Sequence, residues 1–310
     1  MCGGKQVPTC SRTVHSSTVV NNYEKNMKII LSFFLLISSI GFAQSDTTEL
    51  KFNTKYYNAV DKWIAFPKKE ADTTFTLGFI YLDEQAGFTF DYHSRFLETD
   101  NGLKILAREF EAGLKSRLSR NTINVAVLTE KQVSELEIPS VPEWLAVYKE
   151  GSDKVGYLKN IGFHYNAVGA SNLALEPLNK AYEIEPHFKG LEFELAYAYN
   201  ALGQFEKSIP VLESAIENDK ENFLFYRELG FSYKNLEQIE KAENIYREGM
   251  KLTKDKAQKG EMAVNMAQSY FNLKDKNKFK EWAKLTRKYS DKGSRFEQFI
   301  ETWEEKLNAE

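Results

Sequence analysis

The residues best suited to acid–base or metal chemistry lie in the first half of this 310-residue chain. Asp91 and His93 are two residues apart, so on a β-strand their side chains would share a face, and Asp83 and Glu84 precede them in a predicted turn. These groups could supply an acid–base pair or part of a metal site. Hydrolytic metals usually need three protein ligands, however, and no His-Glu-x-x-His spacing is present. We therefore interpret the four residues as a turn and a solvated strand face, and keep catalysis there as the alternative.

Other signatures of catalysis are missing from the sequence. His164 and His187 are the remaining histidines after residue 43, and neither has a second metal ligand at a useful spacing. The chain has no Gly-x-Ser-x-Gly motif and no phosphate-binding glycine loop. We therefore predict that the protein is not an enzyme and that it binds neither a cofactor nor a metal.

Residues 27–43 have the pattern of a secretory signal peptide. A lysine follows the methionine, and the apolar run Ile29–Phe42 is about 14 residues long, whereas a helix that crosses a bilayer needs roughly 20. The run ends in Gly-Phe-Ala, with small residues where a signal peptidase reads. We expect cleavage before Gln44 and a periplasmic or secreted protein, with an uncleaved anchor or a buried helix as the alternatives.

The first 26 residues carry no pattern of their own. They precede the methionine of a complete signal, so we interpret residues 1–26 as an extension that is not part of the protein. Cys2 and Cys10 both lie there, which leaves no cysteine for disulfides or thiol chemistry after residue 43. Removing residues 1–43 takes four basic residues and one acidic residue from totals of 41 and 44, which leaves 37 and 43 and a net charge near −6. Because no long basic run remains, we expect no nucleic-acid partner.

The second half of the chain repeats itself every 34 residues. The stretches IGFHYNAVG, LAYAYNALG and LGFSYKNLE begin at Ile161, Leu195 and Leu229, and MAQSYFNLK begins 37 residues later at Met266. We assign the extra residues to a polar linker around Thr253–Gly260. The helical spacing of apolar, small and tyrosine residues predicts an amphipathic first helix in each copy. Each copy has a tyrosine that is followed three positions later by an apolar residue. These pairs are Tyr165 and Val168, Tyr199 and Leu202, Tyr233 and Leu236, and Tyr270 and Leu273.

A turn and a second helix follow in each copy. Gly169 and Gly203 stand where the first helix would end. Small residues recur where the second helix would meet its neighbour, at Ala174, Ala181, Ser208, Ala215, Ala242 and Gly249. At these residues the stretch from Val155 to about Asp291 resembles the tetratricopeptide repeat family, which has this period and this pattern of small and large residues. The fourth copy departs in its second helix, where Phe279, Trp282 and Tyr289 replace the small residues.

The resemblance implies an all-α superhelix in which each repeat completes the core of the next. We place the array at 151–293, with repeats at about 155–188, 189–222, 223–258 and 260–293. Gly162 and Gly230 are expected where the two helices of one repeat come closest. Residues 294–310 are expected to form a capping helix, whose apolar face would be Phe296, Phe299, Ile300, Trp303 and Leu307.

The resemblance also implies a concave groove, lined by the first helices, that binds a segment of another protein. The family's facing positions correspond here to Lys159, Phe163, Asn166, Phe193, Tyr197, Asn200, Arg227, Phe231 and Lys234, with Gln268 and Phe271 in the fourth copy. Some family members clamp a C-terminal carboxylate with lysines and asparagines, but only Lys159 matches that clamp. For Tyr197 and Phe231 the alternative is a place in the core between repeats.

Residues 44–150 are expected to form an antiparallel β-rich domain, with strands between Thr73 and Leu128. Phe75, Leu77, Phe79 and Tyr81 alternate with other residues, as do Phe88, Phe90 and Tyr92, and Asp100–Gly102 predicts a hairpin turn. Because of that turn we favour strands over a helix of matching period for Leu103–Leu118. Ile123, Val125 and Val127 predict another strand. A proline-bounded connector then carries a short helix that docks Trp144 and Leu145.

These patterns predict an α+β protein in which an antiparallel β-rich lobe precedes a tetratricopeptide-repeat superhelix with a C-terminal cap. The function that they favour is an exported, non-enzymatic scaffold or adaptor in the bacterial cell envelope. Its expected partner is another protein or a peptide segment, with no membrane anchor after signal cleavage. The alternative is an envelope hydrolase, or a hydrolase accessory, with its chemistry in the β-rich lobe.

Overall fold

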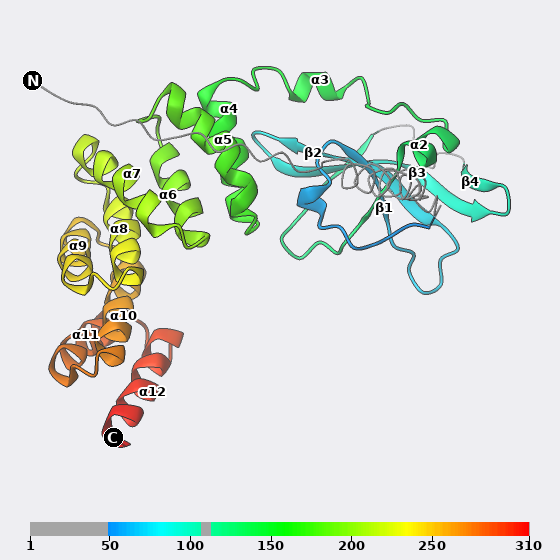
Figure 1. Ribbon diagram of the computed structural model, residues 1–310. Coiled ribbons are helices and arrows are strands. Elements are labelled where there is room, and N and C mark those ends of the chain that lie inside the picture. The colour runs from blue at the N-terminus through cyan, green and yellow to red at the C-terminus, as the bar shows by residue number, and fades with distance from the viewer. Residues whose placement is uncertain (1–48, 107–112, 310) are drawn as a thin grey trace, which may run out of the picture. The chain divides into compact units, whose positions relative to one another are not determined.

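The structure, a computed structural model, describes residues 49–106 and 113–309 (Figure 1). Contacts divide the chain into residues 1–49 and residues 50–310, and the described helices and strands belong to the second unit. The predicted extension, the predicted signal peptide and both cysteines lie outside the described residues. Within the described part of the chain, no helix has the length and apolar character needed to span a membrane.

An antiparallel sheet forms the first part of this unit, as predicted. Its strand order is β4-β3-β2-β1-β6, and β5 pairs with β3 beside β4. The strands found among the described residues are β1 (Lys62–Phe66), β2 (Phe75–Asp83), β3 (Gly87–Thr99), β4 (Gly102–Ile105), β5 (Leu114–Arg117) and β6 (Ala126–Val127). The alternating residues of β2 are buried on both faces of the sheet, because each face has its own apolar cluster.

A β-bulge reverses the two faces of β3 halfway along the strand. The pairing of β2 with β3 shifts between Leu77 and Gly78, so that His93 is an extra residue on β3. The aromatic residues before the bulge face one cluster, whereas Phe96 after it joins the other. Gly78 is required here because a Cβ at this position would lie 2.3 Å from the Phe90 ring.

The sequence predicted this sheet incompletely. The hairpin turn at Asp100–Gly102 is confirmed, and the described parts of Leu103–Leu118 are strands β4 and β5 rather than a helix. The strand β1 was missed, although it lies between β2 and β6. The strand predicted around Ile123 is reduced to the two residues of β6, and Ile123 itself is 57% exposed.

The connector after the sheet contains two short helices, α2 (Glu130–Glu135) and α3 (Leu145–Tyr148). The prediction of a helix that docks Trp144 and Leu145 is confirmed. Leu145 is buried in one of the two apolar clusters of the sheet, and the Trp144 ring lies 5.0 Å from the ring of Tyr81. The helix α2 was not predicted, although its Thr129–Gln132 capping box is a recognisable start signal.

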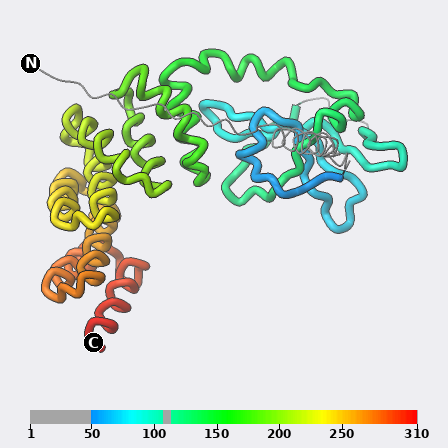
Figure 2. The backbone as a smooth tube through the Cα atoms, viewed as in Figure 1, coloured from blue at the N-terminus to red at the C-terminus, as the bar shows by residue number. Residues whose placement is uncertain are grey.

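Four helix pairs and a final helix make up the rest of the described chain, and the predicted fold class is confirmed. The pairs are α4 (Val155–Ala167) with α5 (Ser171–Ile184), α6 (Leu191–Ala201) with α7 (Phe205–Asn218), α8 (Phe223–Asn235) with α9 (Ile239–Leu252), and α10 (Lys256–Asn272) with α11 (Lys276–Tyr289). The final helix is α12 (Arg295–Ala309). The backbone trace shows short turns between successive helices (Figure 2).

Glycines set the distance between the helices of a pair. A Cβ at Gly162 would lie 2.3 Å from Leu178 on α5, and a Cβ at Gly230 would lie 2.5 Å from the Tyr246 ring on α9. Both glycines were predicted at these close approaches. Gly169 and Gly203 adopt positive φ angles of 81° and 71° in the turns, as expected for residues that end a helix. The small residues predicted on the second helices are all buried.

The shared tyrosines tie each repeat to the one before it. The Tyr199 hydroxyl donates to Asn179 on α5 at 2.8 Å, and the Tyr233 hydroxyl donates to Glu213 on α7 at 2.7 Å. The Tyr270 hydroxyl makes the equivalent bond to Glu243 on α9. A residue on the preceding second helix therefore accepts from the same tyrosine position three times along the array.

Two details of the predicted repeats need correction, and the departure of the fourth copy has a structural outcome. Leu202 and Leu273, which follow the last residue of α6 and of α10, were placed on the apolar face but are 37% and 59% exposed. Residues 256–260 belong to α10 rather than to a linker, so the extra length is helical. The large residues of the fourth copy do not disrupt its second helix, and Trp282 is fully buried on α11.

The final helix α12 covers the end of the array, as predicted for a cap. Ile300 and Leu307 are buried in the core of the array. The Trp303 ring stacks on Phe271 of α10 at 5.7 Å and on Phe299 at the same distance.

The β2–β3 turn contacts the first helix of the array. Asn160 donates to the Glu84 carboxylate at 2.9 Å, and His164 Nε2 lies 3.0 Å from the Glu84 backbone carbonyl oxygen. Burial lowers the pKa of His164, and the hydrogen bond to Glu84 opposes this shift. The predicted turn at Asp83–Glu84 therefore has a structural role against α4.

Candidate functional site

Two adjoining hollows lie along the first helices of the later repeats. The first has a volume of about 360 Å³ and is lined by residues of α6, α8 and α10, namely Tyr197, Asn200, Ala201, Arg227, Glu228, Phe231, Glu261 and Asn265. The second has a volume of about 500 Å³ and is lined by residues of α8, α10 and α12, namely Phe231, Glu261, Val264, Asn265, Gln268, Phe296, Phe299 and Trp303. Phe231, Glu261 and Asn265 line both hollows, so we treat them as one groove.

Aromatic side chains provide most of the apolar wall of the groove. Tyr197 is 38% exposed, which places it at the surface of the groove rather than in the core between repeats. Phe231 is half-buried, lies 6.1 Å from the Phe205 ring and faces both hollows. The stacked rings of Phe299 and Trp303 extend the wall along α12. These rings offer contact area to a ligand without any change in the fold.

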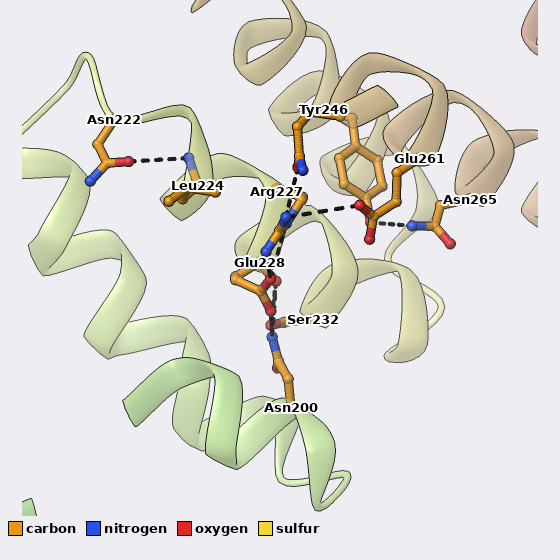
Figure 3. Close-up of polar contacts among 10 residues, drawn as sticks. Asn200, Asn222, Leu224, Arg227, Glu228, Ser232, Tyr246, Glu261 and Asn265 are labelled. Atoms are coloured by element: carbon orange, nitrogen blue, oxygen red, sulfur yellow. Dashed lines mark hydrogen bonds and ion pairs between the residues drawn. The ribbon is translucent and has the colours of Figure 1, made fainter. Parts of the chain in front are cut away.

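Arg227 is the centre of a polar network in the groove (Figure 3). Its Nη2 donates to the Glu228 carboxylate at 2.8 Å and its Nη1 donates to Gln258 at 2.6 Å. The Glu261 carboxylate is farther away, at 3.8 Å. Arg227 also lies over the Phe193 ring at 5.6 Å, and its side chain is only 15% exposed. Arg227 is therefore mainly a structural residue, which holds α8 against α10 and α6.

The two asparagines predicted to face a partner are used within the protein. Asn166 donates to the backbone carbonyl and the carboxylate of Glu194 on the next first helix, at 2.9 Å each. Asn200, which lies 34 residues after Asn166, makes the same two contacts with Glu228, at 3.2 and 3.1 Å. Both asparagines are buried. They form a ladder of bonds between successive first helices, although Asn200 also lines the first hollow.

The remaining predicted residues divide between the groove and the first repeat. Lys234 donates to Gln268 at 2.6 Å and lies over the Phe231 ring at 5.8 Å, and burial lowers its pKa. Phe193 is half-buried and packs against the core. Lys159 and Phe163 lie on α4 and line neither hollow; Lys159 donates to Asn160 and Phe163 is 44% exposed. In the fourth copy, Gln268 lines the second hollow, whereas Phe271 packs against the core.

Sequence reasoning missed several residues of the groove. Glu261, Val264 and Asn265 on α10 were not predicted to face a ligand, and α12 was interpreted only as a cap. A signal for Val264 existed, because it lies 37 residues after Arg227 and so occupies the same position in the fourth copy. The contribution of α12 had no such signal, since this helix lies outside the repeat.

The alternative site around Asp91 and His93 has contacts within the sheet but, among the described residues, no group of side chains placed to hold a metal ion. His93 packs its ring 5.3 Å from that of Trp63, and its Nδ1 lies 3.0 Å from the Ser94 hydroxyl. Across residues 49–106 and 113–309, no group of three His, Cys, Asp or Glu side chains is placed to hold a metal ion. His187 lies far along the chain and contacts Glu192 at 2.7 Å.

A family model described as tetratricopeptide repeat matches residues 193–222 and 225–256, which are the second and third helix pairs. The helical array is built from tetratricopeptide repeats. No curated protein matches the chain.

Solved structures of other repeat proteins are similar to part of the chain. A thermophilic TPR protein of Thermus thermophilus, TTC0263, has a TM-score of 0.43 and 18% identity, over 52% of this chain and 86% of that one. A structure of MamA has a TM-score of 0.41 and 20% identity, over 54% of this chain and 88% of that one. MamA from Desulfovibrio magneticus RS-1 has a TM-score of 0.41 and 17% identity, over 47% and 80%.

Proposed function

We propose that this protein is an exported adaptor that binds an extended segment of another protein in the groove along α6, α8, α10 and α12. The observation that carries the proposal is the pair of adjoining hollows, which share Phe231, Glu261 and Asn265. Aromatic rings and a few polar groups along one channel suit a peptide with alternating apolar and polar side chains. Tetratricopeptide repeats present such a surface on their first helices.

The adaptor has no catalytic role in this proposal. The described residues that line the groove include no arrangement of nucleophile and base, and its arginine, Arg227, is hydrogen-bonded to the Glu228 carboxylate. Export rests on the pattern of residues 27–43. The bacterial cell envelope is favoured because the sequence contains no Asn-x-Ser/Thr glycosylation sequon.

The groove is tested by a double variant that spares the structural contacts. Tyr197→Ala with Phe231→Ala removes two rings from the wall, whereas Phe193 and Arg227 are left in place because they also hold the helices together. The matched control is Ile184→Ala with Leu273→Ala, two apolar residues that are 58% and 59% exposed and line neither hollow. Both variants should retain the helical circular dichroism of the parent.

Affinity capture from cells that express each protein, quantified by mass spectrometry, should then separate the two variants. We expect the groove variant to lose the partners that the parent and the control retain, since truncation of an interface anchor commonly costs about 2 kcal/mol or more. Capture that survives the groove variant but is abolished by Asp91→Ala with His93→Ala would move the active surface to the β-rich domain.

Export is tested by N-terminal sequencing of the native protein. We expect a terminus at Gln44, because Ala43 ends the signal pattern. A native protein that retains Met27 or Met1 and sits in the membrane would contradict the proposed compartment.

A further inference from the structure

The charged residues that line the groove carry more negative than positive charge. Arg227, Glu228 and Glu261 are the charged residues that line the two hollows. The Arg227 guanidinium donates to Glu228 and to Gln258, at 2.8 and 2.6 Å. Glu261 is left 3.8 Å from Arg227, beyond hydrogen-bond distance. The Glu261 carboxylate therefore faces both hollows with only this longer ion pair to Arg227.

Glu261 is held in an environment that disfavours its charge. Burial raises the pKa of its carboxyl group and the nearby Glu228 adds to this effect, whereas Arg227 opposes it. A cation placed in the hollow would reverse this penalty, because an opposite charge at close range favours the ionised carboxylate.

The protein's own cations beside the second hollow are engaged elsewhere. Lys234 donates to Gln268 at 2.6 Å, and burial lowers its pKa. Arg295 lies over the Phe299 ring at 5.1 Å. Neither side chain forms an ion pair with Glu261 among the described residues.

The walls around Glu261 suit a long basic side chain. Phe231, Phe299 and Trp303 line the second hollow together with Glu261. The faces of such rings attract an ammonium or guanidinium group, and the methylene stem of lysine or arginine packs on apolar surface. The amide oxygens of Asn265 and Gln268 can accept further hydrogen bonds from the same group.

We propose that the second hollow receives a basic side chain, lysine or arginine, from the bound segment, with its charged group beside the Glu261 carboxylate and its stem against Phe231 and Trp303. This inference rests on the proposed function, since it names the chemistry of one residue of the partner. The inference fails if the groove binds no peptide. The groove can, however, bind peptides that have no basic side chain at this position.

The test is selection from a display library of random ten-residue peptides against the immobilised full chain. The variants are Glu261→Gln, which removes the charge, and Glu261→Lys, which reverses it. Glu217→Gln is the matched control, because Glu217 is an exposed residue of α7 that lines neither hollow. The Tyr197→Ala/Phe231→Ala variant reports whether the selected peptides use the groove at all.

We expect peptides selected on the parent to be enriched in lysine or arginine at one position, and this enrichment to persist with Glu217→Gln. Synthetic copies of these peptides should bind Glu261→Gln at least about tenfold more weakly, as expected for the loss of a charged hydrogen-bond partner. On Glu261→Lys the enrichment should change to aspartate or glutamate.

The outcomes separate the two proposals. Peptides that need Tyr197 and Phe231 but show no basic preference, and that bind Glu261→Gln as well as the parent, would overturn the basic-side-chain inference and leave the groove intact. If the Tyr197→Ala/Phe231→Ala variant selects the same peptides as the parent, the groove itself is wrong and both proposals fail.

Discussion

Replacing Gly230 by alanine tests how closely the third helix pair is packed. A Cβ at this position would lie 2.5, 2.6 and 2.9 Å from three atoms of the Tyr246 ring, closer than any side chain can approach without movement. Tyr246 is fully buried between α8 and the neighbouring helices, so its ring has no open space into which it can turn. One added methyl group must therefore push α8 and α9 apart.

Two effects of opposite sign determine how much Gly230→Ala changes the free energy of unfolding. Alanine is better than glycine in a helix interior by about 1 kcal/mol, which would stabilise the variant. Overpacking of a buried site typically costs about 1–3 kcal/mol. We therefore expect Gly230→Ala to be less stable than the parent by up to about 2 kcal/mol. Gly230→Leu should lie at the upper end of the overpacking range, because its side chain must displace the whole ring.

The assay is urea unfolding followed by the far-ultraviolet circular dichroism of the helices, in a double-mutant cycle with Tyr246→Leu. Removing the ring should relieve the clash, so Gly230→Ala should become neutral or stabilising in that background. Gly156→Ala on α4 is the control, since a Cβ there would meet Phe188 at an ordinary 3.5 Å. If Gly230→Ala stabilised the parent as much as Gly156→Ala does, the assigned register of α8 against α9 would be refuted.

Three further predictions concern single side chains. Burial opposes the ionisation of Glu243, but hydrogen bonds from Lys278, Tyr270 and Arg247 outweigh it and lower its pKa to about 2. The folded-state pKa thus lies below the usual 4.5, so the stability that Glu243 contributes at neutral pH is lost as pH falls from about 4.5 toward 2. Glu243→Gln should be about 1–3 kcal/mol less stable at pH 7, and its unfolding free energy should vary less over that acid range than the parent's. Lys115→Ala removes an ammonium group that lies 4.7–5.3 Å from the rings of Tyr81, Trp144 and Tyr148, so we expect a loss of about 0.5–1 kcal/mol and faster amide exchange in β5, measured by hydrogen–deuterium exchange. Asn200→Ala should cost about 1–3 kcal/mol in urea unfolding because it removes the amide that donates to Glu228, whereas Tyr197→Ala, at an exposed position, should change stability by less than about 0.5 kcal/mol.

The sequence predicted the helical array well because its period is a direct consequence of packing. Each repeat must place small residues where helices touch, so Gly162 and Gly230 could be located from their spacing alone. The direction of individual polar side chains could not be predicted in this way. Asn166 occupies a facing position of the family, yet its side chain donates to Glu194 on the next first helix. The reason is that the amide is buried, and buried polar groups are hydrogen-bonded within the protein.

The sheet was harder to predict because its strands carry weaker signals. The run Lys62–Phe66 has five residues and no flanking alternation, so β1 was missed although two strands pair with it. The bulge at His93 also has no signature in the sequence, since alternation continues on either side of it. Whether Asp91 and His93 lie on one face of the strand therefore depends on where the strand bulges, which their spacing alone does not determine.

The groove begins at the last step of the ladder of asparagine bonds and continues beyond it. The first two steps of the ladder join Asn166 to Glu194 and Asn200 to Glu228. The third step has Lys234 in place of asparagine, and it reaches Gln268 rather than a carboxylate. The inner polar residues of the early repeats thus bind one another, whereas those of α10, which include Glu261 and Asn265, face the hollows. The first hollow thus adjoins the last asparagine step, since Asn200 and Glu228 line it, whereas the second hollow lies beyond that step and is lined by residues of α8, α10 and α12.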